Sequence, residues 1–283
     1  MAQGCENWTM VISNRSGWLD TNLRELWRYR DLIFLFVRRD FVAIYKQTIL
    51  GPIWFLLQPL FSTIVFTVVF GKIANIPTDG LPQPLFYMAG IVAWNYFSNC
   101  LSATSNTFIT NASIFGKVYF PRLAVPVSVV ITYLMTFVIQ FTVFLCFLLF
   151  FYLKGATLKP NLFILLTPYL IIQMGILGLG FGILVSSLTT KYRDLTFLVG
   201  FGIQLWMYAS PIVYPLSQIP KRWQWVMALN PMVAIVETFR YAFLGAGVMK
   251  PLFLGISLAV TLAVLSVGIT LFRRIEKTFM DTV

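Results

Sequence analysis

The uncharged run LAVPVSVVITYLMTFVIQFTVFLCFLLFFYL, from Leu123 to Leu153, decides what kind of fold this chain adopts. It exceeds the roughly 20 residues that a helix needs to cross about 30 Å of bilayer hydrocarbon. Further uncharged runs lie on either side of it, so the sequence predicts an all-α integral membrane protein with six transmembrane helices. Their approximate bounds are 50–71, 85–107, 123–153, 161–188, 195–214 and 251–272.

The composition supports the same class. Of the 283 residues, 58% are hydrophobic and 11% are charged, and the mean hydropathy is +0.80. Soluble domains carry about 25% charged residues, so lipid is the expected solvent for most of this chain. The sequence has no His, and its three Cys are far apart, which excludes His-based catalysis and His-ligated zinc or haem. We therefore predict no catalytic residue and no metal site.

The basic residues are distributed unevenly across the predicted membrane. Fourteen Lys and Arg lie on the side of the two termini, and seven lie on the other side. Basic residues concentrate on the cytoplasmic side of membrane proteins, so both termini are predicted to be cytoplasmic. The net charge of +11 is then explained mostly by basic residues at the cytoplasmic side of the membrane, and it does not indicate a nucleic-acid partner. Residues 1–17 lack the apolar stretch of a signal peptide and are expected to be an N-terminal extension.

Residues 18–47 precede the first span and are too polar to cross a bilayer. Their apolar residues, Phe34 among them, fall on one arc at helical spacing, which predicts an amphipathic helix in the cytoplasmic interface. Its polar side carries basic residues that can meet anionic groups at the membrane surface. Simple orientation by the positive-inside rule explains them as well. These residues are Arg24, Arg28, Arg38 and Arg39.

Residues 215–249 separate the fifth and sixth spans and contain two apolar pieces, each too short to cross the membrane. Asn230 is placed to cap the second piece, with Pro231 at its first helical position. Gly245 or Gly247 is expected to end it. Glu237 and Arg240 have the spacing of an ion pair on one helix face. The segment therefore predicts two short re-entrant helices that lie against a membrane pathway.

The loop between the second and third predicted spans, residues 111–122, is short and half apolar. An apolar patch exposed to the cytosol indicates a partner, although the same residues could instead anchor the loop in the membrane surface. The candidate docking residues are Ile114, Phe115, Gly116, Lys117, Val118 and Tyr119.

The sequence predicts a membrane pathway but contains no motif that would supply the energy for transport. It contains no GxxxxGK[ST] phosphate loop, and no Asp or Glu lies in any of the six predicted spans. Carriers driven by protons or sodium place ionisable groups near the midplane of the membrane. A membrane enzyme needs a nucleophile, a base or a metal site. We therefore expect a separate partner to supply the energy, although a membrane-embedded glycosyl- or acyltransferase stays as a weaker alternative.

Aromatic residues make up 17% of the chain. Most aromatic side chains in membrane proteins form core packing and interfacial belts. Their faces also stack on the C–H faces of sugar rings, so uncharged aromatic spans would suit a long polyhydroxyl polymer. The candidate pathway residues are Trp54, Phe55, Phe61, Phe66, Trp206, Tyr208 and Tyr214.

Several short strings occur in an order that resembles the polysaccharide-type ABC-2 permeases, which include the O-antigen, capsule and teichoic-acid permeases. The first is YKQTILGPIW at 45–54 with QP at 58–59, and KVYFPR at 117–122 and YRD at 192–194 follow. The others are SPIVYP at 210–215, LNPM at 229–232 and RIEKTF at 274–279. The resemblance runs from about residue 20 to the C-terminus and leaves residues 1–17 outside.

The resemblance implies a homodimer of six-span subunits with two cytoplasmic ATPase subunits, which bind ATP and Mg²⁺ while this chain binds no cofactor. Such a permease exports a polyprenyl-diphosphate-linked glycan across the bacterial plasma membrane. By the same resemblance, the loop at 111–122 couples to the ATPase, residues 18–47 form the gate or interface helix, and residues 48–283 form one transmembrane domain. The arginines of that helix could then meet the diphosphate. An ABC-2 permease for a drug or a small lipid remains the main alternative.

Overall fold

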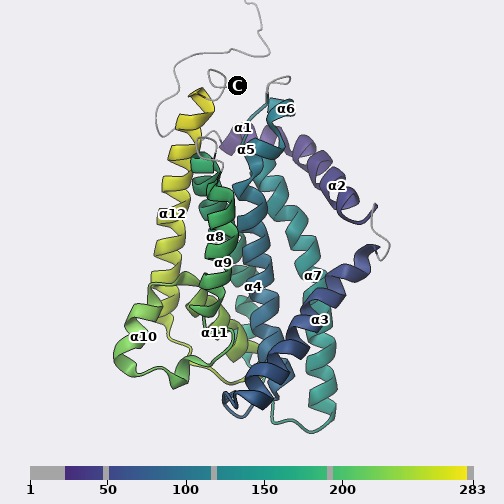
Figure 1. The fold of residues 1–283 in the computed structure, drawn as a ribbon, viewed down its shortest axis with the longest axis vertical. Coiled ribbons are helices and arrows are strands. Elements are labelled where there is room, and N and C mark those ends of the chain that lie inside the picture. Colours follow the sequence, from purple (N-terminus) through teal and green to yellow (C-terminus); the bar gives the residue numbers. More distant parts are fainter. Residues whose placement is uncertain (1–22, 47–50, 116–119, 190–193, 279–283) are drawn as a thin grey trace, which may run out of the picture.

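A computed structural model describes residues 23–46, 51–115, 120–189 and 194–278 (Figure 1). Over these ranges all regular secondary structure is helical and no strand occurs, as the composition predicted. The helices are α1 (Leu23–Arg28), α2 (Arg30–Lys46), α3 (Trp54–Phe66), α4 (Gln83–Ser105), α5 (Thr107–Thr110), α6 (Ala112–Phe115), α7 (Ala124–Leu153), α8 (Thr167–Thr189), α9 (Leu195–Tyr208), α10 (Lys221–Ala228), α11 (Pro231–Leu244) and α12 (Pro251–Thr278). Short 3₁₀ or π turns are η1 (Gly51–Ile53), η2 (Thr67–Ile73), η3 (Leu162–Leu166) and η4 (Leu216–Gln218).

Four helical stretches among the described residues are long and apolar enough to cross a membrane. They are Trp54–Ile73, Ala124–Leu153, Leu162–Thr189 and Pro251–Ile275, close to four of the predicted spans. The two remaining predicted spans differ from these in composition or length. α4 is long but carries Asn, Ser and Gln side chains, and α9 has only 14 residues. The predicted fifth span, 195–214, is wrong at its end because the helix stops at Tyr208, just before the Ser210–Pro211 pair.

Helix α4 is the centre of the bundle. Every residue from Leu85 to Trp94 is buried, and the helix packs against α3, α7, α8 and α11. Figure 1 shows α4, α7, α8 and α12 upright and side by side, with α2 and α3 oblique on one side. α10 and α11 lie at one end of this bundle, and α1, α5 and α6 lie at the other. The polar side chains of α4 lie outside this run: Thr104 and Ser105 are buried, whereas Asn95 is half-buried and Ser102 is exposed.

The predicted single helix over residues 18–47 is instead two helices, because a turn at Tyr29 separates α1 from α2. Residues 18–22 and 47 lie outside the described part of the chain. The buried stripe of α2 is Ile33, Phe36 and Val37, which packs on α7. Phe34, expected on the same apolar arc, is 65% exposed. The contact with α7 selects a narrow stripe at spacing i, i+3, i+4, so the rest of the apolar arc faces outward.

Helix α8 approaches its neighbours through glycines. A Cβ atom on Gly182 would lie 2.5 Å from the Cβ of Thr104 on α4. A Cβ on Gly268 of α12 would lie 2.7 Å from the carbonyl oxygen of Gly180. Small residues let helix backbones come close, which favours helix association in membranes through van der Waals contact. The α4–α8–α12 layer therefore depends on these missing side chains.

Replacing Gly182 by Ala should push α8 away from Thr104 and destabilise the protein by about 1–3 kcal/mol, the usual cost of overpacking. The measurement is the thermal midpoint in detergent, followed by fluorescence-detected size exclusion. Gly200→Ala is the matched control, because a Cβ on Gly200 of α9 has no atom within 4 Å. Equal midpoints for the two variants would contradict the close-packing argument.

Candidate functional site

The second helix of the predicted external segment has the caps that the sequence indicates. The side chain of Asn230 accepts a hydrogen bond from the N–H of Met232 at 3.1 Å, and Pro231 opens α11. Gly245 ends the helix in the left-handed region with φ 76°, a conformation that glycine adopts without steric cost. The predicted N-cap is therefore confirmed, and Gly245 is the residue that ends the helix.

Glu237 and Arg240 form the predicted ion pair in the interior of the protein. Oε1 of Glu237 lies 3.6 Å from Nη1 of Arg240, and the two side chains are 2% and 1% exposed. Glu237 also accepts hydrogen bonds from the N–H of Leu216 at 3.4 Å and of Val248 at 3.0 Å. A carboxylate buried this far is tolerated only because it is paired and hydrogen-bonded.

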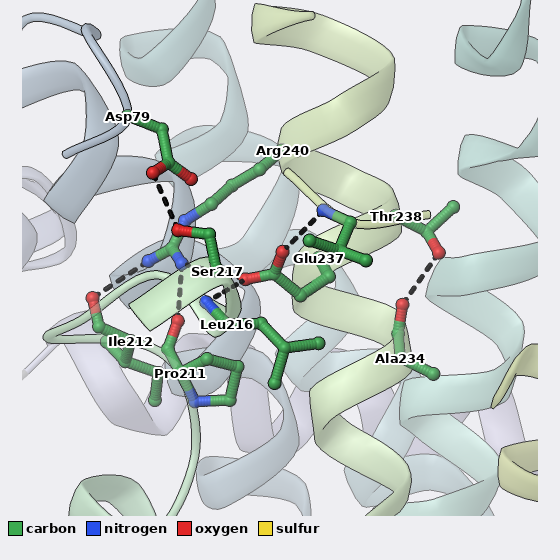
Figure 2. A network of polar contacts seen from close by, with 10 residues as sticks. Asp79, Pro211, Ile212, Leu216, Ser217, Ala234, Glu237, Thr238 and Arg240 are labelled. Atoms are coloured by element: carbon green, nitrogen blue, oxygen red, sulfur yellow. Dashed lines mark hydrogen bonds and ion pairs between the residues drawn. The ribbon is translucent and has the colours of Figure 1, made fainter. Parts of the chain in front are cut away.

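Arg240 directs its guanidinium at the backbone that follows α9. It donates one hydrogen bond to the carbonyl oxygen of Pro211 and a second, of 2.8 Å, to that of Ile212. Its Cζ lies 3.7 Å from the centroid of the Phe86 ring on α4, a cation–π contact in a desolvated position. Figure 2 shows the guanidinium between these carbonyls and Glu237. A Cβ on Gly90 would lie 2.7 Å from Nη2, so this glycine of α4 leaves the space for the guanidinium.

These contacts, which we call the Arg240 network, join three segments that are far apart in the sequence. They link α11 to the chain at 211–216, to the chain at 248 and to α4. Each carbonyl and N–H in the network would cost about 1–3 kcal/mol if it were buried without a partner. The network therefore holds a non-helical stretch of backbone inside the protein and fixes α11 against the bundle.

Asn230 has a second role that the sequence did not indicate. Its Oδ1 accepts from the indole Nε1 of Trp206 at 3.0 Å, and its Nδ2 donates to Oγ of Ser210 at 2.9 Å. Trp206 also packs edge-on against Trp94 and Phe181, with centroids 6.3 and 4.9 Å apart. Asn230 thus fastens the end of α9 to the start of α11. Only its capping role has a local sequence signal, because its other partners are 20 and 24 residues away.

At the opposite end of the bundle, Phe115 lies in an aromatic cluster. It is 3% exposed, and its ring centroid is 5.8 Å from those of Phe108 and Phe120. Phe108 stacks on Phe272 of α12 at 4.6 Å, and Phe120 contacts Phe36 of α2 at 5.6 Å. We call these five rings the Phe115 cluster. Phe115 therefore packs within its own chain. Neighbouring Ile114 is half-buried, and Gly116, Lys117, Val118 and Tyr119 lie outside the described residues.

The arginines expected on α1 and α2 are placed differently from one another. Arg28 and Arg38 are exposed. Arg39 donates to Oδ1 of Asp40 at 2.7 Å and to Oδ1 of Asn111 at 3.4 Å, and its Cζ lies 4.8 Å from the Phe36 ring centroid. Arg24 belongs to α1, and its side chain is outside the description. Arg39 thus connects α2 to the loop that follows α5.

The candidate pathway aromatics separate into two groups. Phe66 and Trp206 are half-buried and pack against the core, where the ring centroid of Phe66 lies 6.1 Å from that of Tyr87. The others are exposed or half-buried on α3, on α9 or after it: Trp54, Phe55, Phe61, Tyr208 and Tyr214. Tyr214 donates its hydroxyl to the carbonyl oxygen of Tyr208 at 3.2 Å. In the described part of the chain, no three His, Cys, Asp or Glu residues are grouped to hold a metal ion.

The four long apolar helical stretches among the described residues define an integral membrane protein. A family model described as ABC-2 type transporter matches residues 31–244, and the chain belongs to this family. It is thus a permease subunit and not an enzyme.

Curated relatives cover most of the chain. It is 27% identical to the O-antigen export system permease protein RfbA of Klebsiella pneumoniae over 89% of this chain and 94% of that protein. A protein of the same name from Myxococcus xanthus is 28% identical over 78% of this chain and 83% of its own length. The polysialic acid transport protein KpsM of Escherichia coli is 24% identical over 82% and 89%.

Replacing Arg240 by Met should destabilise the protein by about 3–5 kcal/mol, because it leaves the Glu237 carboxylate buried without its partner. Combining it with Glu237→Gln should recover part of the loss, since the buried charge is then gone. Thermal midpoints of the single and the double variant test this, with Arg222→Met on the exposed surface of α10 as the control. If Arg240→Met melts at the same temperature as Arg222→Met, the network does not have this role.

Proposed function

We propose that this chain is the membrane subunit of an ATP-driven exporter that moves a polysaccharide out of a bacterial cell. The observation that carries the proposal is its similarity, over 78–89% of its length, to proteins named for O-antigen export and polysialic acid transport. The absence of Asp and Glu from the predicted spans supports an external energy source.

The finer architecture that we propose has six spans, with α4 and α9 added to the four long apolar stretches. Both termini are cytoplasmic and the chain lies in the inner membrane, with residues 1–17 as an extension and 48–283 as one transmembrane domain. Two copies pair with two ATPase subunits, which hold ATP and Mg²⁺, and the substrate is a glycan on a polyprenyl diphosphate. No nucleic acid is involved.

We also propose that α10 and α11 enter the membrane from the external side without crossing it. The Arg240 network supports this, because it supplies hydrogen-bond partners to backbone groups that lipid cannot satisfy.

We infer that α1 and α2 lie in the cytoplasmic interface. Trp27 and Phe34 are exposed apolar residues that suit the acyl boundary, while Arg28 and Arg38 are exposed basic residues that suit anionic headgroups or the diphosphate. Arg39 is less available, because Asp40 and Asn111 already accept its hydrogen bonds.

We further propose that residues 114–119 couple the ATPase to the spans through the Phe115 cluster. The cluster joins the segment at 115–120 to α2 and to α12, so a displacement of the loop would move both helices. The partner would then contact the loop residues other than Phe115, whose ring is already enclosed. Aromatic residues exposed on α3 and α9 remain our candidates for the pathway.

Deleting the gene in its host should remove the surface polysaccharide and cause lipid-linked glycan to accumulate inside the cell. Expression of the chain with its ATPase should restore both and yield a co-purifying complex. The control is the same chain with an ATPase whose phosphate-binding Lys is replaced by Ala, which should assemble without export. Unchanged surface glycan together with no complex would overturn the proposal. Stimulation of ATP hydrolysis by drugs or small lipids, and not by glycan-lipid, would favour the alternative substrate.

Lys117→Glu should lower export by about tenfold, equivalent to roughly 1.4 kcal/mol of coupling, while the protein stays in the membrane and ATP hydrolysis continues. Phe115→Asp should behave differently and reduce the amount of folded protein, because it places a charge in the Phe115 cluster. The measurements are glycan export and ATPase rate in proteoliposomes. Lys72→Glu, an exposed charge reversal at the other end of the bundle, is the control. Normal coupling in Lys117→Glu would contradict the proposed role of the loop.

A further inference from the structure

An apolar pocket of about 620 Å³ opens between α7, η3 and α8. This volume is within the range of roughly 300–1,000 Å³ that is typical of small-molecule sites. Helix α11 closes one side of it with Phe243, a ring that packs against Phe144 and Phe239. The lining residues that matter here are Leu145, Leu148, Ile164, Thr167, Ile171 and Phe243.

The pocket lies within the membrane-spanning part of the protein, where lipid acyl chains are the apolar groups that can enter it. Its walls come from the last turns of the stretch Ala124–Leu153 and the first turns of the stretch Leu162–Thr189, both long enough to span a membrane. With the orientation that the proposed function includes, these turns are in the outer leaflet. Burying apolar chain against apolar side chains is favourable by dispersion and packing, so hydrocarbon suits this cavity better than water does.

The wall next to α11 is held in place by hydrogen bonds. The N–H of Lys159 donates to the carbonyl oxygen of Leu244 at 3.3 Å, and the N–H of Asn161 donates to that of Ala242 at 3.1 Å. Nδ2 of Asn161 adds a bond of 2.9 Å to the carbonyl oxygen of Tyr241. The segment that carries Pro160 is thereby fixed along α11, so the pocket is formed before any ligand enters.

Two polar side chains, those of Thr167 and Lys159, are suited to bind the ester and the phosphate of a phospholipid. Thr167 lines the pocket and is 7% exposed, and its hydroxyl is buried without a hydrogen-bond partner. Rotation about χ1 exchanges this hydroxyl with the methyl group, and helical Thr commonly populates two such rotamers. In the rotated position it can donate to an ester carbonyl. Lys159 is exposed and adjoins Pro160, a lining residue, so its ammonium can reach a phosphate at the membrane surface.

We propose that this pocket binds the acyl chain of an anionic phospholipid of the outer leaflet, with the ester near Thr167 and the phosphate near Lys159. The assignment of leaflet rests on the proposed function, whereas the pocket and its chemistry do not. Because Phe243 belongs to α11, a bound chain supports the helix that carries the Arg240 network. The lipid would thus contribute to the position of α11.

Photolabelling tests the site directly. The full-length chain is reconstituted in phosphatidylcholine nanodiscs with a trace of phosphatidylglycerol that carries a diazirine on one acyl chain. Adducts are mapped by mass spectrometry, and we expect them on the lining residues of α7 and α8. Ile171→Trp fills the pocket and should lower this labelling by about tenfold. Ile172→Trp is the matched control, since Ile172 is 61% exposed and does not line the pocket.

A second test variant with its own control covers the case in which Ile171→Trp does not fold. Leu145→Trp fills the pocket from α7, and Leu149→Trp, one turn further along, does not line it. Labelling that is unchanged in both filling variants, or that spreads evenly over the lipid-facing residues, would overturn the proposal. The assay needs neither ATPase nor glycan, so its failure is distinguishable from failure of the export function.

The headgroup is tested with the same probe on phosphatidylcholine. We expect several-fold weaker labelling of the pocket than with phosphatidylglycerol, and loss of that difference in Lys159→Gln. Thr167→Val should weaken labelling by both lipids, because the hydroxyl meets an ester that both contain. Equal labelling by the two lipids in the unaltered protein would overturn the anionic specificity.

Discussion

The ion pair between Arg240 and Glu237 is the interaction on which one whole end of this bundle depends. A guanidinium and a carboxylate are both almost fully enclosed, and neither is tolerated in such a place without the other. Between them they bond to backbone groups at 211, 212, 216 and 248, and these groups have no partner within a helix. The pair thus permits an irregular segment to turn back into the protein, where lipid would offer its peptide groups no partner.

That segment is supported by a scaffold with no charge in its core. Helix α4 is buried from Leu85 to Trp94, and its close approach to α8 depends on glycines such as Gly182. Phe86 and Gly90 of the same helix receive the guanidinium of Arg240, one by its ring face and the other by its missing side chain. Helix α4 therefore takes part both in the packing of the spans and in the Arg240 network.

The two ends of the bundle are held by different kinds of contact. The Arg240 network consists of directional hydrogen bonds and an ion pair, which define a single arrangement. The Phe115 cluster consists of stacked, tilted and edge-on ring contacts between 4.6 and 5.8 Å, which stabilise it through dispersion and apolar packing.

The sequence by itself determined whatever depends on neighbours along the chain. The length of the uncharged runs predicted the long apolar helices. Asn230 and Gly245 predicted the ends of α11, and the i, i+3 spacing predicted the pair of Glu237 with Arg240. Each of these is a local property of a helix. Tertiary structure alone decided that α4 is the enclosed helix and that Phe115 packs inward. It also decided which backbone Arg240 binds. The carbonyls that Arg240 binds are 28 and 29 positions away, and the Phe115 cluster includes rings from α2 and α12. No local periodicity specifies which of these faces meet once the helices pack.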